Sequence, residues 1–155
     1  MLRLKILASV IPLAVVAVFA RGEFSAGPRR CIEVEGASVQ IATLSWQAQL
    51  HVSFTSDPLL ATVRVQIAEA PDAADFTVID DIDSAEAGTC ETGAAPQLVA
   101  ISSSSSGSEP VIYLSPDGPA DYRIFVQSKS FSARDAAALI VGARGGHERL
   151  EAASL

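Results

Sequence analysis

Apolar and polar residues alternate most regularly between residues 43 and 55. The apolar positions of this run are Leu44, Trp46, Ala48, Leu50, Val52 and Phe54. Thirteen residues of period two predict one long, half-buried strand. Ser56-Asp57-Pro58 then signals a turn, and alternation resumes over residues 61–68. The two runs therefore predict an antiparallel hairpin.

Shorter apolar runs predict four further strands, at residues 75–80, 97–102, 111–115 and 122–128. Near the end of the chain, Ser132 and Asp135 have the spacing of a capping box, which predicts the start of a helix. Gly145-Gly146 is expected to end it. The pattern predicts an α+β domain, with an antiparallel sheet of five or six strands and one C-terminal helix packed on it. A small β-sandwich is the alternative.

Two short segments of the chain resemble each other. PDAADF at 71–76 and PDGPADY at 116–122 both place a Pro-Asp turn before Ala-Asp and an aromatic residue that enters a strand. The match is too short to predict a repeat architecture. It indicates shared turn chemistry, because proline presets φ and aspartate accepts hydrogen bonds in turns.

The amino-terminal region is typical of an export signal. Arg3 and Lys5 precede an uncharged run from Ile6 to Ala20, which predicts a signal peptide over residues 1–20. An uncleaved membrane anchor is the alternative, although fifteen helical residues span only about 22 Å of a roughly 30 Å hydrocarbon layer. The remainder divides into an irregular arm or linker (21–37), one α+β domain (38–146) and a flexible tail (147–155).

Charge and composition narrow the partners and the compartment. The chain has 18 acidic and 11 basic residues. Loss of residues 1–20 removes two basic residues, so the mature charge would be 9 minus 18, or −9. Such an acidic chain is a poor candidate for nucleic acid, and contact with a membrane is expected only through residues 1–20 if they are retained. The abundance of arginine over lysine and the absence of asparagine favour a bacterial source. The expected location is therefore periplasmic or secreted, with an inner-membrane-anchored periplasmic domain as the alternative.

The two cysteines, Cys31 and Cys90, predict one disulfide bond in an oxidising compartment. No Cys-x-x-Cys motif accompanies them, so a structural role is favoured over a redox or metal role. One acidic loop is a weak candidate for a cation such as Ca²⁺; its residues are Asp80, Asp81, Asp83 and Glu86. They do not follow the EF-hand spacing, so a solvated loop is expected, with no metal and no cofactor.

No catalytic motif is present: there is no G-x-S-x-G elbow, Ser-x-x-Lys pair or phosphate-binding glycine motif. The remaining candidate is the uncharged polar face of the 43–55 run, since exposed strands usually carry charges. Such a face is either covered by another element or used to bind a partner. The candidate binding residues are Gln47, Gln49, His51, Ser53, Arg64 and Arg123.

The sequence thus favours an exported, non-catalytic domain that binds a protein or another envelope component through its sheet. A membrane-tethered accessory subunit of an envelope complex is the first alternative. A small secreted hydrolase is the second, and it would need a serine or a carboxylate close to His51.

Overall fold

The computed structural model describes residues 31–80, 95–104 and 106–153, with side chains up to residue 145. It holds eight strands: β1 (Cys31–Val34), β2 (Ala37–Ile41), β3 (Leu50–Phe54), β4 (Val63–Ile67), β5 (Phe76–Ile79), β6 (Gln97–Ser102), β7 (Val111–Ser115) and β8 (Tyr122–Gln127). The described helices are α2 (Ala133–Ala153) and two single 3₁₀ turns, η1 (Ser45–Gln47) and η2 (Pro71–Ala73).

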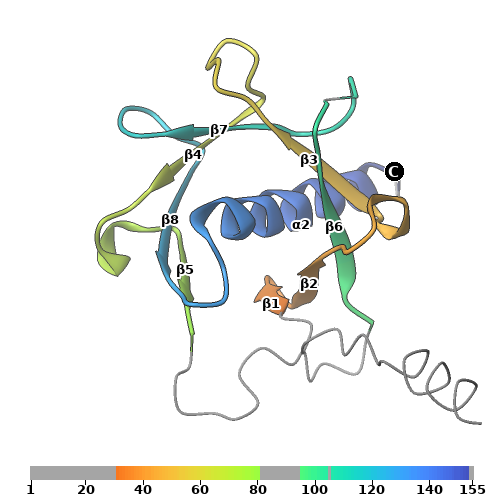
Figure 1. The fold of residues 1–155 in the computed structure, drawn as a ribbon, viewed down its shortest axis with the longest axis horizontal. Helices are drawn as coiled ribbons and strands as arrows, with labels where there is room; N and C mark the ends of the chain where they lie inside the picture. The colour runs from red at the N-terminus through yellow and green to blue at the C-terminus, as the bar shows by residue number, and fades with distance from the viewer. Residues whose placement is uncertain (1–30, 81–94, 105, 154–155) are drawn as a thin grey trace, which may run out of the picture.

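The eight strands form one sheet in the order β1-β2-β6-β3-β7-β4-β8-β5, which curls into a nearly closed barrel around α2 (Figure 1). Only β1 and β2 pair antiparallel, and every other neighbouring pair is parallel. The predicted antiparallel sheet of five or six strands is therefore wrong, and so is the β-sandwich alternative. The C-terminal helix is present and packs on the sheet.

The expected hairpin between residues 43–55 and 61–68 is also wrong. Strand β7 lies between β3 and β4 and is parallel to both. The long alternating run itself is broken: η1 occupies its first half, and only Leu50–Phe54 is strand. Alternation alone could not distinguish a strand from an exposed crossover, in which Leu44 and Trp46 remain 37% and 76% exposed.

The strand order shows that the chain goes around the barrel twice. On the first lap it forms β2, β3, β4 and β5, and each leaves a space one strand wide before the next. On the second lap β6, β7 and β8 fill those three spaces. Each parallel pair in the described sheet therefore joins one first-lap strand to one second-lap strand.

A 13-residue period underlies the first lap. Val39, Val52, Val65 and Val78 lie 13 residues apart, and all four are buried in the core cluster that also contains the helix. Their counterparts on the second lap are Val99, Ile112 and Ile124, which are fully buried. A five-residue strand plus an eight-residue crossover gives this period, so the similarity between 71–76 and 116–122 belongs to a wider repeat.

Between residues 136 and 143, helix α2 is buried on all sides rather than on one stripe. Residues 136–141 are all buried, as is Ala143, and the helix contacts every described strand except β5 through several residues. A helix that is apolar all round is expected inside a core. Small side chains, four of them alanine, let the strands approach the helix axis closely.

The ends of the helix differ in how well the sequence predicted them. The capping box is confirmed, because Ser132 Oγ accepts from the Asp135 amide (3.1 Å) while the Asp135 carboxylate accepts from the Ser132 amide (3.1 Å). The helix continues through Gly145 and Gly146 to Ala153. Each helical glycine costs only about 1 kcal/mol relative to alanine, so the glycine pair need not end the helix.

Candidate functional site

The sequence-predicted binding residues are spread over several elements. Gln47 is in η1, and Gln49 immediately precedes β3; His51 and Ser53 lie in β3, Arg64 in β4 and Arg123 in β8. Strands β4 and β8 are neighbours, but β7 separates both from β3. The structure therefore does not bring these six side chains together on one surface.

The polar face of β3 is used within the fold. Ser53 is only 2% exposed, and the Nε2 atom of His51 lies 3.1 Å from the carbonyl oxygen of Ser45. Crossover turns cover the outside of the second-lap strands: η1 contacts β6, and η2 contacts β8. Of the uncharged polar positions in the 43–55 run, only Ser53 is buried, whereas Thr43, Ser45, Gln47 and Gln49 are exposed, so coverage does not explain the absence of charge there.

Gln49 belongs to a group of side chains that join neighbouring strands at their amino ends. Its Oε1 accepts a hydrogen bond from the Leu98 amide (2.8 Å). Three others do the same: Thr62 for Val111 (2.8 Å), Asp75 for Arg123 (2.7 Å) and Asp121 for Arg64 (2.7 Å). Each satisfies a backbone donor where pairing begins. These residues therefore have a structural role.

Asp80 is likewise bound by its own chain. Its carboxylate accepts from the Ser128 hydroxyl (2.7 Å), from the Ser130 amide (3.0 Å) and from the Lys129 amide. The hydrogen bond from Ser128, followed by those from Lys129 and Ser130, lowers the pKa of Asp80 below its usual value despite some opposing desolvation. Asp81, Asp83 and Glu86 lie outside the described residues. Among the residues that are described, no three potential ligands gather in a way that could hold a metal ion.

Cys31 is disulfide-bonded and begins β1. Cys90 lies outside the described residues, so the pairing of Cys31 with Cys90 stays a prediction.

In the described sheet, the barrel wall is interrupted where the two edge strands, β1 and β5, face each other (Figure 1). We call this opening the seam; its lining consists of Cys31–Val34 of β1, Phe76–Ile79 of β5, and Ile140 of α2. It encloses a cavity of about 290 Å³. Within the described part of the chain, no strand pairs with either facing edge. The seam therefore has largely apolar walls and an apolar floor, and its two edges lack a strand partner among the described residues.

The backbone groups that face into the seam follow from strand geometry. Residues alternate in the side to which their N–H and C=O point. The Asp75 amide donates to Arg123 of β8, so the peptide groups of Phe76 and Val78 are directed to the seam. In β1, the two-residue turn at Glu35-Gly36 makes Val34 and Ala37 the hydrogen-bonded pair. The peptide groups of Glu33 are then directed to the seam from the other side.

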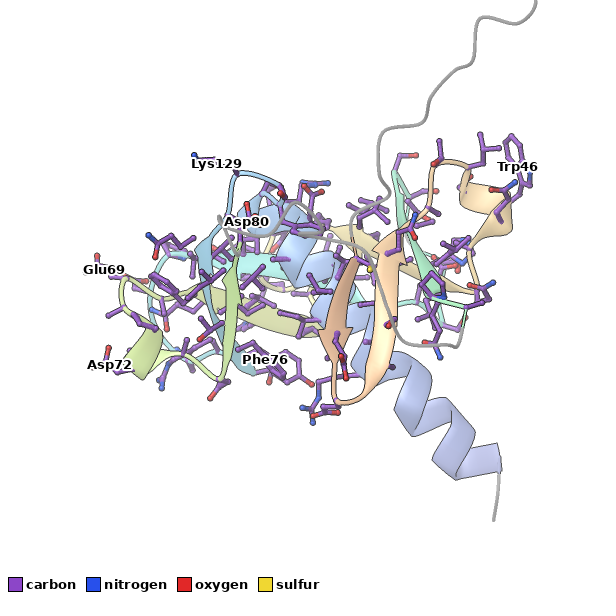
Figure 2. All side chains as sticks on the ribbon, turned by 90° about the horizontal axis from the view of Figure 1, so that it is seen from below. Trp46, Glu69, Asp72, Phe76, Asp80 and Lys129 are labelled. Atoms are coloured by element: carbon purple, nitrogen blue, oxygen red, sulfur yellow. The ribbon has the colours of Figure 1, made fainter. Side chains whose placement is uncertain are left out.

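One end of the seam is closed by Arg144 of α2. Its guanidinium lies 2.6 Å from the Glu35 carboxylate in the β1–β2 turn. It also lies over the rings of Tyr122 (5.3 Å) and Phe76 (5.8 Å), on the β8 and β5 side. Figure 2 shows Phe76 at this end of the sheet and Asp80 farther along the same strand. Arg144 thus bridges the two walls without filling the space between them.

A second hollow, of about 350 Å³, lies at the carboxyl ends of β3 and β7. Its lining comprises Phe54, Thr55, Ser56, Tyr113, Leu114 and Arg134. The Arg134 guanidinium lies 4.0 Å from the centre of the Phe54 ring. The strands that border this hollow, β3 and β7, pair with each other, so it is the weaker candidate.

Comparisons with known proteins found no matching family, no matching curated protein and no matching solved structure. Among the helices that the structure describes, none combines the length and apolar character needed to cross a membrane. The site must therefore be interpreted from its own geometry.

Sequence reasoning missed the seam. Its wall residues belong to the range 21–37, expected to be irregular, and to an ordinary short strand. One signal was available: Ile32, Val34, Val39 and Ile41 flank Glu35-Gly36 at positions that suit a two-residue hairpin.

Proposed function

We propose that this chain is an exported, non-catalytic binding module that accepts an extended peptide segment of a partner protein in the seam. The observation that carries the proposal is that two facing strand edges, at Glu33 of β1 and at Phe76 and Val78 of β5, pair with no other described strand and lie on either side of Ile140. An inserted strand would form backbone hydrogen bonds on both sides, as in peptide recognition by strand addition.

The seam suits a short segment with apolar side chains on one face. Both walls are four residues long. The side chains of Val34, Val78 and Ile140 are almost fully buried at its inner side, so every second residue of the segment should be apolar. On the outer side, Ile79 remains 56% exposed and would contact an outward-facing residue of the segment.

The surroundings of the seam also favour a role in binding. Long unpaired edges promote uncontrolled association, and proteins usually protect them. Here the edges are only four residues long, and Arg144 bridges the two walls at one end. This arrangement limits access to a single extended chain, which favours a specific partner over aggregation.

The test uses fluorescence anisotropy with labelled peptides that carry a four-residue core of valine, isoleucine and threonine. We expect Ile79→Ser to weaken binding several-fold, because it removes apolar contact at the seam. The matched control is Leu59→Ser, which alters an 88% exposed leucine in the β3–β4 crossover and should leave binding unchanged. Equal effects of the two variants, or equal binding of a proline-containing core that lacks amide donors, would refute the proposal.

A further inference from the structure

The second hollow lies on the opposite side of the barrel from the seam. Strands β3 and β7, at whose carboxyl ends it opens, occupy the middle of the strand order, whereas the seam lies between the first and the last strand. Its lining comes from residues 54–56, residues 113–114 and Arg134, all of which the structure describes. What this hollow can bind therefore depends on neither edge strand and on no residue before Cys31.

Arg134 is the only charged residue in the lining of this hollow. Its side chain is exposed, and its guanidinium lies 4.0 Å from the centre of the Phe54 ring. Among the described residues, no carboxylate lies within ion-pair distance of this guanidinium. The adjacent acid, Asp135, instead accepts hydrogen bonds from Ser132 in the capping box. The hollow therefore presents a cation whose charge the described chain does not neutralise.

The position of Arg134 in the helix is unfavourable for helix stability. It is the second residue of α2, and the helix dipole disfavours a positive charge in the first turn. Its contact with Phe54 is made over the face of the ring, so the N–H donors of the guanidinium stay available to an acceptor. An anion beside Arg134 would be stabilised by the guanidinium and by the dipole together. The local charge of this hollow therefore suits an anionic group.

The rest of the lining limits the size and the chemistry of a ligand. Phe54 and Leu114 contribute apolar side chains, and Ser56 and Tyr113 contribute side chains with hydroxyl groups. The volume of about 350 Å³ is at the lower end of the range of roughly 300–1,000 Å³ found for small-molecule sites. One guanidinium matches one carboxylate, and the net charge of −7 on the chain opposes the approach of multiply charged anions.

We infer that the second hollow binds a small monocarboxylate with an aromatic or branched apolar body. The carboxylate accepts hydrogen bonds from the guanidinium of Arg134, and the apolar body lies against Phe54 and Leu114. This inference goes beyond the proposed function and is independent of it, because the lining of this hollow and the lining of the seam share no residue.

Phenylacetate and its neutral isostere phenylacetamide test this inference, with backbone amide shifts of the chain followed by NMR during titration. We expect phenylacetate to shift the amides of Thr55 and Leu114 and to bind about fivefold more tightly than phenylacetamide. Arg134→Gln should remove this preference, and Arg134→Lys should retain part of it, because lysine keeps the charge without the planar fork. The matched control, Arg123→Gln, changes an exposed arginine of β8 and should preserve the preference.

Three results would overturn the inference. The first is the absence of any shift at Thr55 and Leu114 in millimolar phenylacetate. The second is equal affinity of the unaltered chain for the two ligands, which would show that the hollow does not recognise the carboxylate. The third is a shift at Val78 without one at Thr55, which would place the ligand in the seam. The comparison of the two ligands needs no variant, so it stays decisive even if Arg134→Gln fails to fold.

Discussion

Gly142 is the position at which the close fit between helix and barrel can be tested most directly. A Cβ atom added there would lie 2.9 Å from Cγ1 and 3.0 Å from Cγ2 of Val99. Val99 is fully buried in β6, and its branched side chain has little rotamer freedom. Alanine at position 142 would therefore have to displace the helix or the strand.

The expected free-energy change combines two opposing terms. Overpacking in a well-packed core costs about 1–3 kcal/mol, whereas replacing a helical glycine by alanine gains about 1 kcal/mol. We expect Gly142→Ala to lower the free energy of unfolding by roughly 1 kcal/mol. Gly145→Ala is the matched control, since the added Cβ would lie 3.5 Å from Pro110 Cγ, an ordinary contact distance. That variant should instead gain up to about 1 kcal/mol.

Urea denaturation followed by circular dichroism measures both changes. Tryptophan fluorescence is unsuitable, because Trp46 is 76% exposed in the folded state. A double-mutant cycle with Val99→Ala makes the cause explicit: without the two methyl groups, Gly142→Ala should become stabilising by about 1 kcal/mol. If Gly142→Ala stabilises the chain as much as Gly145→Ala does, the close packing of α2 against β6 is refuted.

Three further predictions concern polar contacts. Asp80→Asn should lower stability at pH 7 in urea denaturation. Because the pKa of Asp80 is depressed in the folded state, the stabilisation by its ionised carboxylate is present above the usual pKa of 3.8 and is lost as the pH falls below that value. If the difference in stability between the wild-type chain and Asp80→Asn persists at pH 2, ionisation of Asp80 is not its cause. Asp121→Ala should cost about 1 kcal/mol and speed hydrogen exchange at the Arg64 amide, while unchanged exchange there would contradict the hydrogen bond. Arg144→Ala should lower the free energy of unfolding by roughly 1 kcal/mol in the same assay, because it removes the ion pair with Glu35 and the two aromatic contacts. If 1 M salt does not reduce this loss of stability, the aromatic contacts alone account for it.

Local features of the fold were predictable because they depend on neighbouring residues. The run at 111–115 has the bounds of β7, and the run at 97–102 has those of β6. The helix start at Ser132 depends on two side chains three residues apart. Strand pairing was mispredicted because the partners of β3 and β4 come from a distant part of the chain, and no local turn specifies them.

The clearest missed signal is the 13-residue spacing of Val39, Val52, Val65 and Val78. Four buried valines at one constant interval indicate four equivalent strands joined by equivalent crossovers. Strands joined by hairpins would instead run in alternating directions. The seam could not be predicted in this way, because it depends on which two strands are left at the edges when the barrel stops short of closure.

Because the chain goes around the barrel twice, its strands do not all find partners in the order in which they are synthesised. The chain emerges amino end first, and until Gln97 appears the only strand pairing available among the described elements is the β1–β2 hairpin. Until β6, β7 and β8 are synthesised, β3, β4 and β5 have no pairing partner among the described strands and their apolar faces stay exposed. Helix α2, against which these faces pack, is the last of the described elements to emerge. Such non-local assembly is intrinsically slow. Slow assembly with apolar strand faces exposed favours aggregation of the nascent chain, and in a fragment ending at residue 80 none of the described strands has a parallel partner.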